Sequence, residues 1–156
     1  MGDRLQLLRH ARACLVASHL LAPPLLISRV YLTSPVDCPE GCEPFLNGVM
    51  EAELTGDAEG LLRDLRTLEE ALGRPARKRR NTPRTIDLDL LYVDDCVMNS
   101  GDLILPHPRM LERRFVLAPL ADIRPGMILP GQSETVAQLL RKLPGTDTAE
   151  PLDATW

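Results

Sequence analysis

The stretch Pro83–Asp95, PRTIDLDLLYVDD, is the part of the chain that says most about its fold and chemistry. Its apolar and polar residues alternate with a period of two, which is typical of a half-buried β-strand. One face of this strand would carry Ile86, Leu88, Leu90 and Tyr92. The other face would place the carboxylates of Asp87 and Asp89 side by side, where they repel each other unless water or a cation lies between them.

A basic segment precedes this predicted strand. Its arginine and lysine residues are Arg74, Arg77, Lys78, Arg79, Arg80 and Arg84. Paired carboxylates beside guanidinium groups suit a magnesium–polyphosphate complex, because Mg²⁺ prefers oxygen ligands and arginine binds phosphate oxygens with a planar fork. The same pattern also fits a solvent-facing strand that follows a solvated basic loop, and these residues alone leave both interpretations open.

The composition is that of one globular domain, with 156 residues, 44% hydrophobic and 26% charged, and a formal net charge of -4. The acidic balance argues against a general nucleic-acid binder, and the basic segment has no interleaved aromatic residues for base stacking. No apolar run approaches the roughly 20 residues of a membrane span, and the N-terminus has no signal-peptide layout. We therefore expect a cytoplasmic protein without nucleic-acid or membrane partners.

Two of the four cysteines, Cys38 and Cys42, share a loop rich in proline and glycine and could form half of a metal site. No second Cys/His pair follows at zinc-finger spacing, because His107 stands alone downstream. Reduced thiols are therefore the expected state, as is usual in a cytosolic protein.

Helical and strand-like patterns follow one another along the chain. The expected helices are one from Asp3 that ends by Pro23-Pro24, one with the stripe Leu61, Leu65, Leu68 and Leu72, short turns within 110–120, and Glu134–Leu143. The expected strands are 25–32, 45–54 and 83–95, and 103–105 is a short apolar piece that runs into Pro106-His107-Pro108. This order predicts an α+β fold, with one sheet covered by helices, over residues 1–143. Residues 144–156 are expected to form a mobile tail.

Four segments in register resemble motifs of the 6-hydroxymethyl-7,8-dihydropterin pyrophosphokinase family. They are NTPRTIDLDLL at 81–91, LPHPRMLERRFVLAPL at 105–120, LEEALGR at 68–74, and YLTSPV at 31–36 together with FLN at 45–47. The resemblance covers roughly residues 2–143 and implies a ferredoxin-like α+β sheet. It also implies transfer of pyrophosphate from ATP to the hydroxymethyl group of the pterin, giving AMP and the pterin diphosphate in folate biosynthesis.

By resemblance, the residues that would act on the phosphates fall into three groups. Asp87 and Asp89 would hold two Mg²⁺ ions that bridge the ATP phosphates and the pterin hydroxyl. The loop arginines Arg74 and Arg84 would act in catalysis by engaging the phosphates. The ATP site would also include Glu69, Arg77, Leu90, His107 and Arg113, with Arg113 chosen over Arg114 by the family register alone.

The pterin would occupy a slot between aromatic side chains. The resemblance assigns stacking to Phe45 and Phe115, recognition of the ring edge to Asn47, and mainly backbone contacts to Thr33 and Val36. Without the resemblance, the two phenylalanines would more often be core residues. ATP and the pterin are then the expected partners of a monomer.

The start of the chain departs from the family pattern. The family opens with an apolar strand and a Gly-Ser-Asn turn, whereas this sequence begins Met1-Gly2-Asp3-Arg4 at the end of that turn. The N-terminal strand is therefore expected to be missing. The alternative to an active enzyme is a truncated, catalytically impaired relic that retains nucleotide binding.

Overall fold

The computed structural model describes residues 2–35, 41, 43–73 and 85–156. The chain divides into two compact units. The first unit spans residues 1–24, 52–90 and Trp156, and the second unit spans residues 25–51 and 91–155.

Two helices lie in the described part of the first unit. Helix α1 (Gly2–Val16) has Asp3 in its first turn, close to the helix start expected at that residue. Helix α2 (Ala58–Ala71) begins after Asp57, whose carboxylate accepts a hydrogen bond from Gly60 N at 2.6 Å. Gly73 has a φ of +96° just after the helix, a conformation that favours glycine at this position. The predicted stripe is confirmed where Leu61 and Leu65 are buried.

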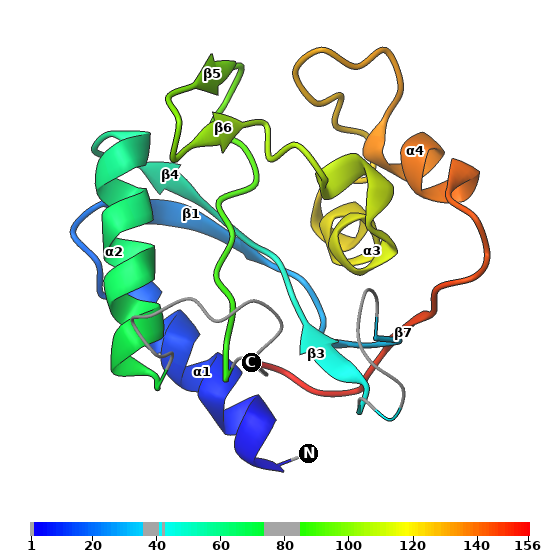
Figure 1. Ribbon diagram of the computed structural model, residues 1–156, viewed down its shortest axis with the longest axis horizontal. Coiled ribbons are helices and arrows are strands. Elements are labelled where there is room, and N and C mark those ends of the chain that lie inside the picture. The colour runs from blue at the N-terminus through cyan, green and yellow to red at the C-terminus, as the bar shows by residue number, and fades with distance from the viewer. Residues whose placement is uncertain (1, 36–40, 42, 74–84) are drawn as a thin grey trace. The chain divides into compact units, whose positions relative to one another are not determined.

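The second unit has an apolar core around α3 (Arg114–Ile123), which Figure 1 shows next to α4 (Val136–Lys142). Helix α3 is preceded by a 3₁₀ turn, η1 (Met110–Glu112). The buried core residues are Val49, Met110, Val116, Leu117, Leu120, Leu129 and Val136. A stop was expected near Pro119 or Pro125, and α3 ends just before Pro125, with Pro119 inside it because buried packing on the core outweighs one missing hydrogen bond.

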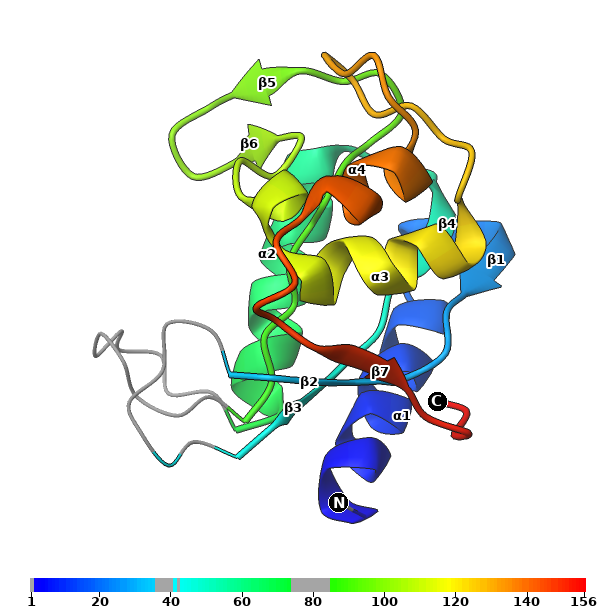
Figure 2. The same cartoon turned by 90° about the vertical axis from the view of Figure 1, so that its right-hand side faces the viewer.

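Three strands form the largest sheet among the described residues, in the order β3 (Phe45–Asn47), β2 (Tyr31–Thr33) and β7 (Ala149–Pro151). Both pairs are antiparallel, and Figure 2 shows β7 beside β2. Leu152 N also donates to Val30 O at 2.8 Å. The expectation of a tail over 144–156 is therefore wrong for β7, because backbone pairing can order a short segment whose side chains give no apolar pattern.

The other strands form two smaller pairs. Strand β1 (Leu21–Ile27) pairs with β4 (Met50–Leu54), and β5 (Met98–Asn99) pairs with β6 (Ile104–Leu105). The mixed helix and strand content agrees with the expected α+β class. The described residues nevertheless contain three separate small sheets, so the expected single sheet is not seen in this part of the chain.

The predicted strand at 83–95 is wrong over its described part, because residues 86–93 adopt no regular secondary structure. Its backbone groups bond elsewhere: Leu88 N donates to a side chain of α2, and Leu91 O accepts from His107 N. Alternating apolar and polar residues indicate that one side of a segment is buried and the other exposed. A strand also needs a neighbouring strand for its backbone hydrogen bonds, and the alternation does not show whether one is present.

Two predicted strand boundaries also differ from the observed ones. The strand expected at 25–32 is divided between β1 and β2, and the strand expected at 45–54 is divided between β3 and β4. Ser28 explains part of this, because its hydroxyl accepts from Val49 N at 2.9 Å and donates to Arg29 O at 2.7 Å. No helix in the described ranges is long and apolar enough to cross a membrane.

Candidate active site

The carboxylates of Asp87 and Asp89 are both exposed on the first unit. Ile86 is buried, at 7% exposure, and Leu88 is half-buried, so burial alternates along this segment even though it is not a strand. The alternation makes the two acidic side chains project away from the interior. Leu90, a predicted ATP-site residue, is half-buried one position beyond Asp89.

This acidic pair suits a magnesium site in which the protein supplies only some of the ligands. Across the described segments, no group of three or more His, Cys, Asp and Glu side chains could hold a metal ion. Mg²⁺ bound to a nucleotide takes one or two carboxylates from the protein and its other ligands from phosphate oxygens and water. Two exposed carboxylates one residue apart match that demand.

Glu69 lies in the last turns of α2 and is only 3% exposed. Its Oε1 atom accepts a hydrogen bond from Leu88 N at 2.7 Å. The bond joins α2 to the segment that carries Asp87 and Asp89, which runs alongside this helix in Figure 1. Sequence reasoning found Glu69 but gave no sign of this contact, because the two residues are 19 positions apart.

Three of the predicted pterin-site residues lie together on β2 and β3 of the second unit. Thr33 is paired with Phe45, and Asn47 follows on the same face of the sheet. Asn47 Nδ2 donates to Thr33 Oγ1 at 2.7 Å, which orients the amide. Thr33 is 2% exposed, whereas Phe45 is 43% exposed. Phe45 is therefore not a core residue, and its ring is accessible.

Phe115 and Arg113 lie at the start of α3, the helix that contacts β2 and β3. The Arg113 guanidinium carbon is 5.3 Å from the centre of the Phe115 ring, a cation–π contact. The neighbouring Arg114 faces other groups, and its Nη2 donates to Leu143 O at 3.0 Å and Pro144 O at 3.2 Å. Arg114 thus binds carbonyl groups at the C-terminal end of α4, and the ligand role of Arg113 stays a prediction.

His107 is held by its backbone and by one ring nitrogen. Its N–H donates to Leu91 O at 2.7 Å, and its Nδ1 accepts from Arg109 N at 3.2 Å. An accepting Nδ1 carries no proton, so the neutral imidazole has its proton on Nε2. The geometry makes Nε2 a hydrogen-bond donor, which suits a purine or phosphate acceptor.

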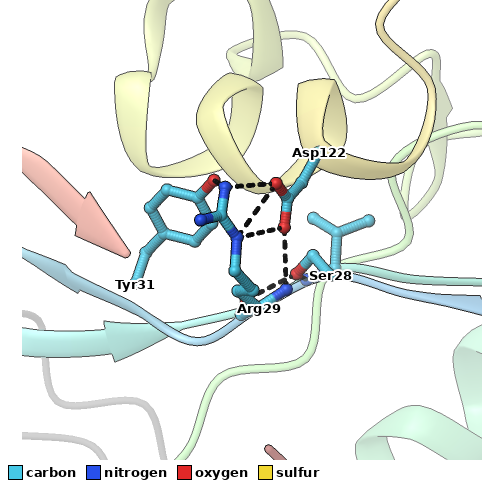
Figure 3. A network of polar contacts seen from close by, with 5 residues as sticks. Ser28, Arg29, Tyr31 and Asp122 are labelled. Atoms are coloured by element: carbon cyan, nitrogen blue, oxygen red, sulfur yellow. Dashed lines mark hydrogen bonds and ion pairs between the residues drawn. The ribbon is translucent and has the colours of Figure 1, made fainter. Parts of the chain in front are cut away.

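A network that the sequence did not reveal supports strand β2, as Figure 3 shows. Arg29 donates to Asp122 through its side chain, and its Nη2 donates to Tyr31 Oη at 3.3 Å. The hydrogen bond from Arg29 lowers the pKa of Asp122, and burial raises the pKa of Tyr31. Arg29 and Asp122 are 93 positions apart, so no local motif could have indicated the pair.

A second network includes Tyr92, which follows the acidic segment. Its hydroxyl donates to Glu51 on β4, and Arg124 Nε donates to the same carboxylate at 2.9 Å. The Arg124 hydrogen bond lowers the pKa of Glu51, while burial raises the pKa of the Tyr92 phenol. These hydrogen bonds hold Tyr92, which follows the acidic segment, to Glu51 of β4.

The predicted site residues are thus divided between the two units. The first unit holds Glu69, Asp87, Asp89 and Leu90, and the second unit holds Thr33, Phe45, Asn47, His107, Arg113 and Phe115. Within the second unit, the structure brings Thr33, Phe45 and Asn47 together. Val36, Arg74, Arg77 and Arg84 lie outside the described residues, as do Cys38 and Cys42, while the described Cys14 and Cys96 are free thiols.

Two exposed carboxylates one residue apart suit an enzyme that acts on metal-bound phosphates. A family model described as 7,8-dihydro-6-hydroxymethylpterin-pyrophosphokinase (HPPK) matches residues 1–125. The chain belongs to this family of pyrophosphokinases, and the resemblance inferred from its motifs is confirmed.

Curated relatives are similar to most of the chain. A 2-amino-4-hydroxy-6-hydroxymethyldihydropteridine pyrophosphokinase of Bacillus subtilis (strain 168) is 41% identical over 123 residues, 79% of this chain and 72% of that protein. The enzyme of that name from Methylorubrum extorquens is 41% identical over 99 residues, 64% of this chain and 61% of that protein. The folic acid synthesis protein fol1 of Schizosaccharomyces pombe is 36% identical over 121 residues, 76% of this chain and 16% of that protein.

Proposed function

We propose that the chain transfers a pyrophosphoryl group from ATP to the hydroxymethyl group of 6-hydroxymethyl-7,8-dihydropterin, releasing AMP. Membership of the HPPK family is the observation that carries the proposal, and the exposed Asp87 and Asp89 pair supports it. The family match and the named relatives favour an active enzyme in folate biosynthesis over a truncated relic.

The reaction needs positioning and charge neutralisation more than covalent chemistry. Its nucleophile is a primary alcohol and its electrophile is the β-phosphorus of a polyanion. Asp87 and Asp89 would hold two Mg²⁺ ions, which supply Lewis-acid polarisation of the phosphate oxygens when bound. We assign phosphate contacts to Arg74, Arg77 and Arg84 by family resemblance.

By family resemblance, we assign the pterin contacts and several ATP contacts to residues of the second unit. The exposed Phe45 ring and the oriented Asn47 amide suit a flat ring with a polar edge, with Phe115 as the second stacking residue and Thr33 and Val36 as lining. His107 would donate through Nε2 to the nucleotide, and Arg113 would neutralise charge. Leu90 would offer an apolar contact to the base.

A coupled assay for AMP tests the proposal. The purified chain is mixed with ATP, Mg²⁺ and 6-hydroxymethyl-7,8-dihydropterin, and AMP and the pterin diphosphate are quantified by chromatography. We expect equal amounts of both products, and none when either the pterin or Mg²⁺ is omitted. AMP formation that is independent of the pterin, or its absence in a chain that binds both substrates, would overturn the proposal. Light scattering in the same buffer checks the further proposal of a monomer.

A further inference from the structure

A buried carboxylate interrupts the apolar stripe of α2. Leu61 and Leu65 are each 6% exposed, and Glu69 follows at the same helical spacing with 3% exposure. An apolar residue at this position would continue the stripe. Glutamate is almost never buried to this extent without a polar partner, so the position calls for a specific contact.

One hydrogen bond of Glu69 is to the backbone between the two acidic residues. Leu88 N donates to Glu69 Oε1 at 2.7 Å, and Leu88 is flanked directly by Asp87 and Asp89. A hydrogen bond to a carboxylate is among the stronger kinds in proteins. Since residues 86–93 have no strand partner in the described structure, this bond fixes the middle of the acidic segment to a helix.

We infer that Glu69 is a positioning residue for the metal-binding pair and acts through Leu88 N rather than by touching ATP. The inference rests on the proposed function, because it takes Asp87 and Asp89 as the Mg²⁺ ligands. A side chain 3% exposed offers almost no surface to a nucleotide. By holding Leu88 against α2, Glu69 keeps the two exposed carboxylates turned the same way, as a shared metal–phosphate group requires.

Two substitutions at Glu69 separate the effect of side-chain length from the effect of charge. Glu69→Gln keeps the side-chain length and an acceptor oxygen but removes the charge. Glu69→Asp keeps the charge but is one methylene shorter, so its carboxylate no longer reaches Leu88 N. If Glu69 positions the segment, the aspartate variant should lose more activity than the glutamine variant. If Glu69 bound Mg²⁺ or ATP directly, the glutamine variant should lose more activity than the aspartate variant.

The first readout is the Mg²⁺ concentration that gives half-maximal activity. We expect it to rise at least about tenfold in Glu69→Asp and to stay within about twofold in Glu69→Gln. Glu70→Asp, which makes the same change at an exposed position of α2, is the matched control and should leave the value unchanged. A greater loss in the glutamine variant than in the aspartate variant would overturn the inference, as would no change in either.

The second readout is independent of activity. Amide hydrogen exchange at Leu88, followed by NMR in the complete chain, should be slow in the wild type and in Glu69→Gln. We expect it to be at least about tenfold faster in Glu69→Asp, with exchange in α2 unaltered. If Glu69→Asp proves too unstable to study, Glu69→Leu extends the apolar stripe and should show the same faster exchange; unchanged exchange in a folded variant would overturn the inference.

The same series distinguishes failure of this inference from failure of the proposed function. Asp89→Asn is measured alongside the Glu69 variants. If Asp89→Asn loses activity while Glu69→Asp has wild-type Mg²⁺ dependence, only the positioning role is overturned. If Asp89→Asn is fully active, the assignment of the metal site is overturned whatever the exchange rate at Leu88.

Discussion

Arg29 and Asp122 lie 93 positions apart in the sequence and form a two-point ion pair. Arg29 Nη2 is 2.6 Å from Asp122 Oδ1, and Arg29 Nε is 3.0 Å from Asp122 Oδ2. Arg29 N also donates to Asp122 Oδ2 at 2.9 Å, so the carboxylate receives backbone and side-chain bonds at once. The pair joins the chain between β1 and β2 to the last turn of α3.

We expect low pH to reduce the stability of the folded state through the carboxylates of Asp122 and Glu51. The Arg29 hydrogen bond lowers the pKa of Asp122 below its ordinary 3.8, and the Arg124 hydrogen bond lowers the pKa of Glu51 below 4.5. Such groups stabilise the folded state above their unfolded pKa, and the contribution is lost as pH falls through the folded pKa. Because the arginine partners are exposed, solvent screening keeps the effect modest.

Urea unfolding of the wild type and of Asp122→Asn at several pH values checks this prediction. The wild type should have the higher midpoint at neutral pH, and the difference should shrink as pH falls below about 4. A difference that persists or widens in acid would contradict the assignment of the ion pair. Asp95→Asn, a change at an exposed carboxylate in the same unit, is the control.

Asp89→Asn should abolish pyrophosphoryl transfer while the fold is retained, because it removes a proposed metal ligand from an exposed position. We expect AMP formation to fall by at least about 100-fold, roughly 2.7 kcal/mol in the barrier. Asp95→Asn, which changes an exposed carboxylate in the following turn, should stay near wild type. Activity within about tenfold of wild type would exclude Asp89 as a ligand.

Phe45→Ala should weaken pterin binding without destabilising the protein. The ring is 43% exposed, so its removal leaves no cavity, and stability should change by no more than about 0.5 kcal/mol. Loss of an aromatic stacking contact is worth about 0.5–1.5 kcal/mol, which raises the KM for the pterin about 2- to 13-fold. Ile104→Ala, at a residue 39% exposed, should alter neither quantity. Steady-state kinetics and thermal unfolding of both variants measure the two effects.

Arg113→Ala and Arg114→Ala should have opposite consequences. Arg114 donates to Leu143 O and Pro144 O, so its loss should destabilise the fold by about 1.5–3 kcal/mol, with little effect on the KM for ATP. Arg113 stacks on Phe115 and is assigned to the ATP site by family resemblance, so its loss should raise the KM for ATP. Unfolding curves and ATP titrations distinguish the two, and a reversed result would return the ligand role to Arg114.

Local patterns in the sequence determined the features that depend on neighbouring residues. The spacing of Leu61 and Leu65 predicted the buried face of α2, and the alternation from Ile86 to Leu90 predicted which side chains are exposed. The motifs around Asp87 and Asp89 identified the family. Helical spacing, capping and burial are set within a few residues, so they can be read without the rest of the fold.

The tertiary structure decided which distant groups satisfy one another's hydrogen bonds. The acidic segment is not a strand because its backbone bonds to Glu69 and His107 instead of to a neighbouring strand. Strand β7 exists because β2 offers a free edge to residues that have no strand pattern of their own. These pairings depend on which segments the packing brings together, and no local pattern in the chain records that choice.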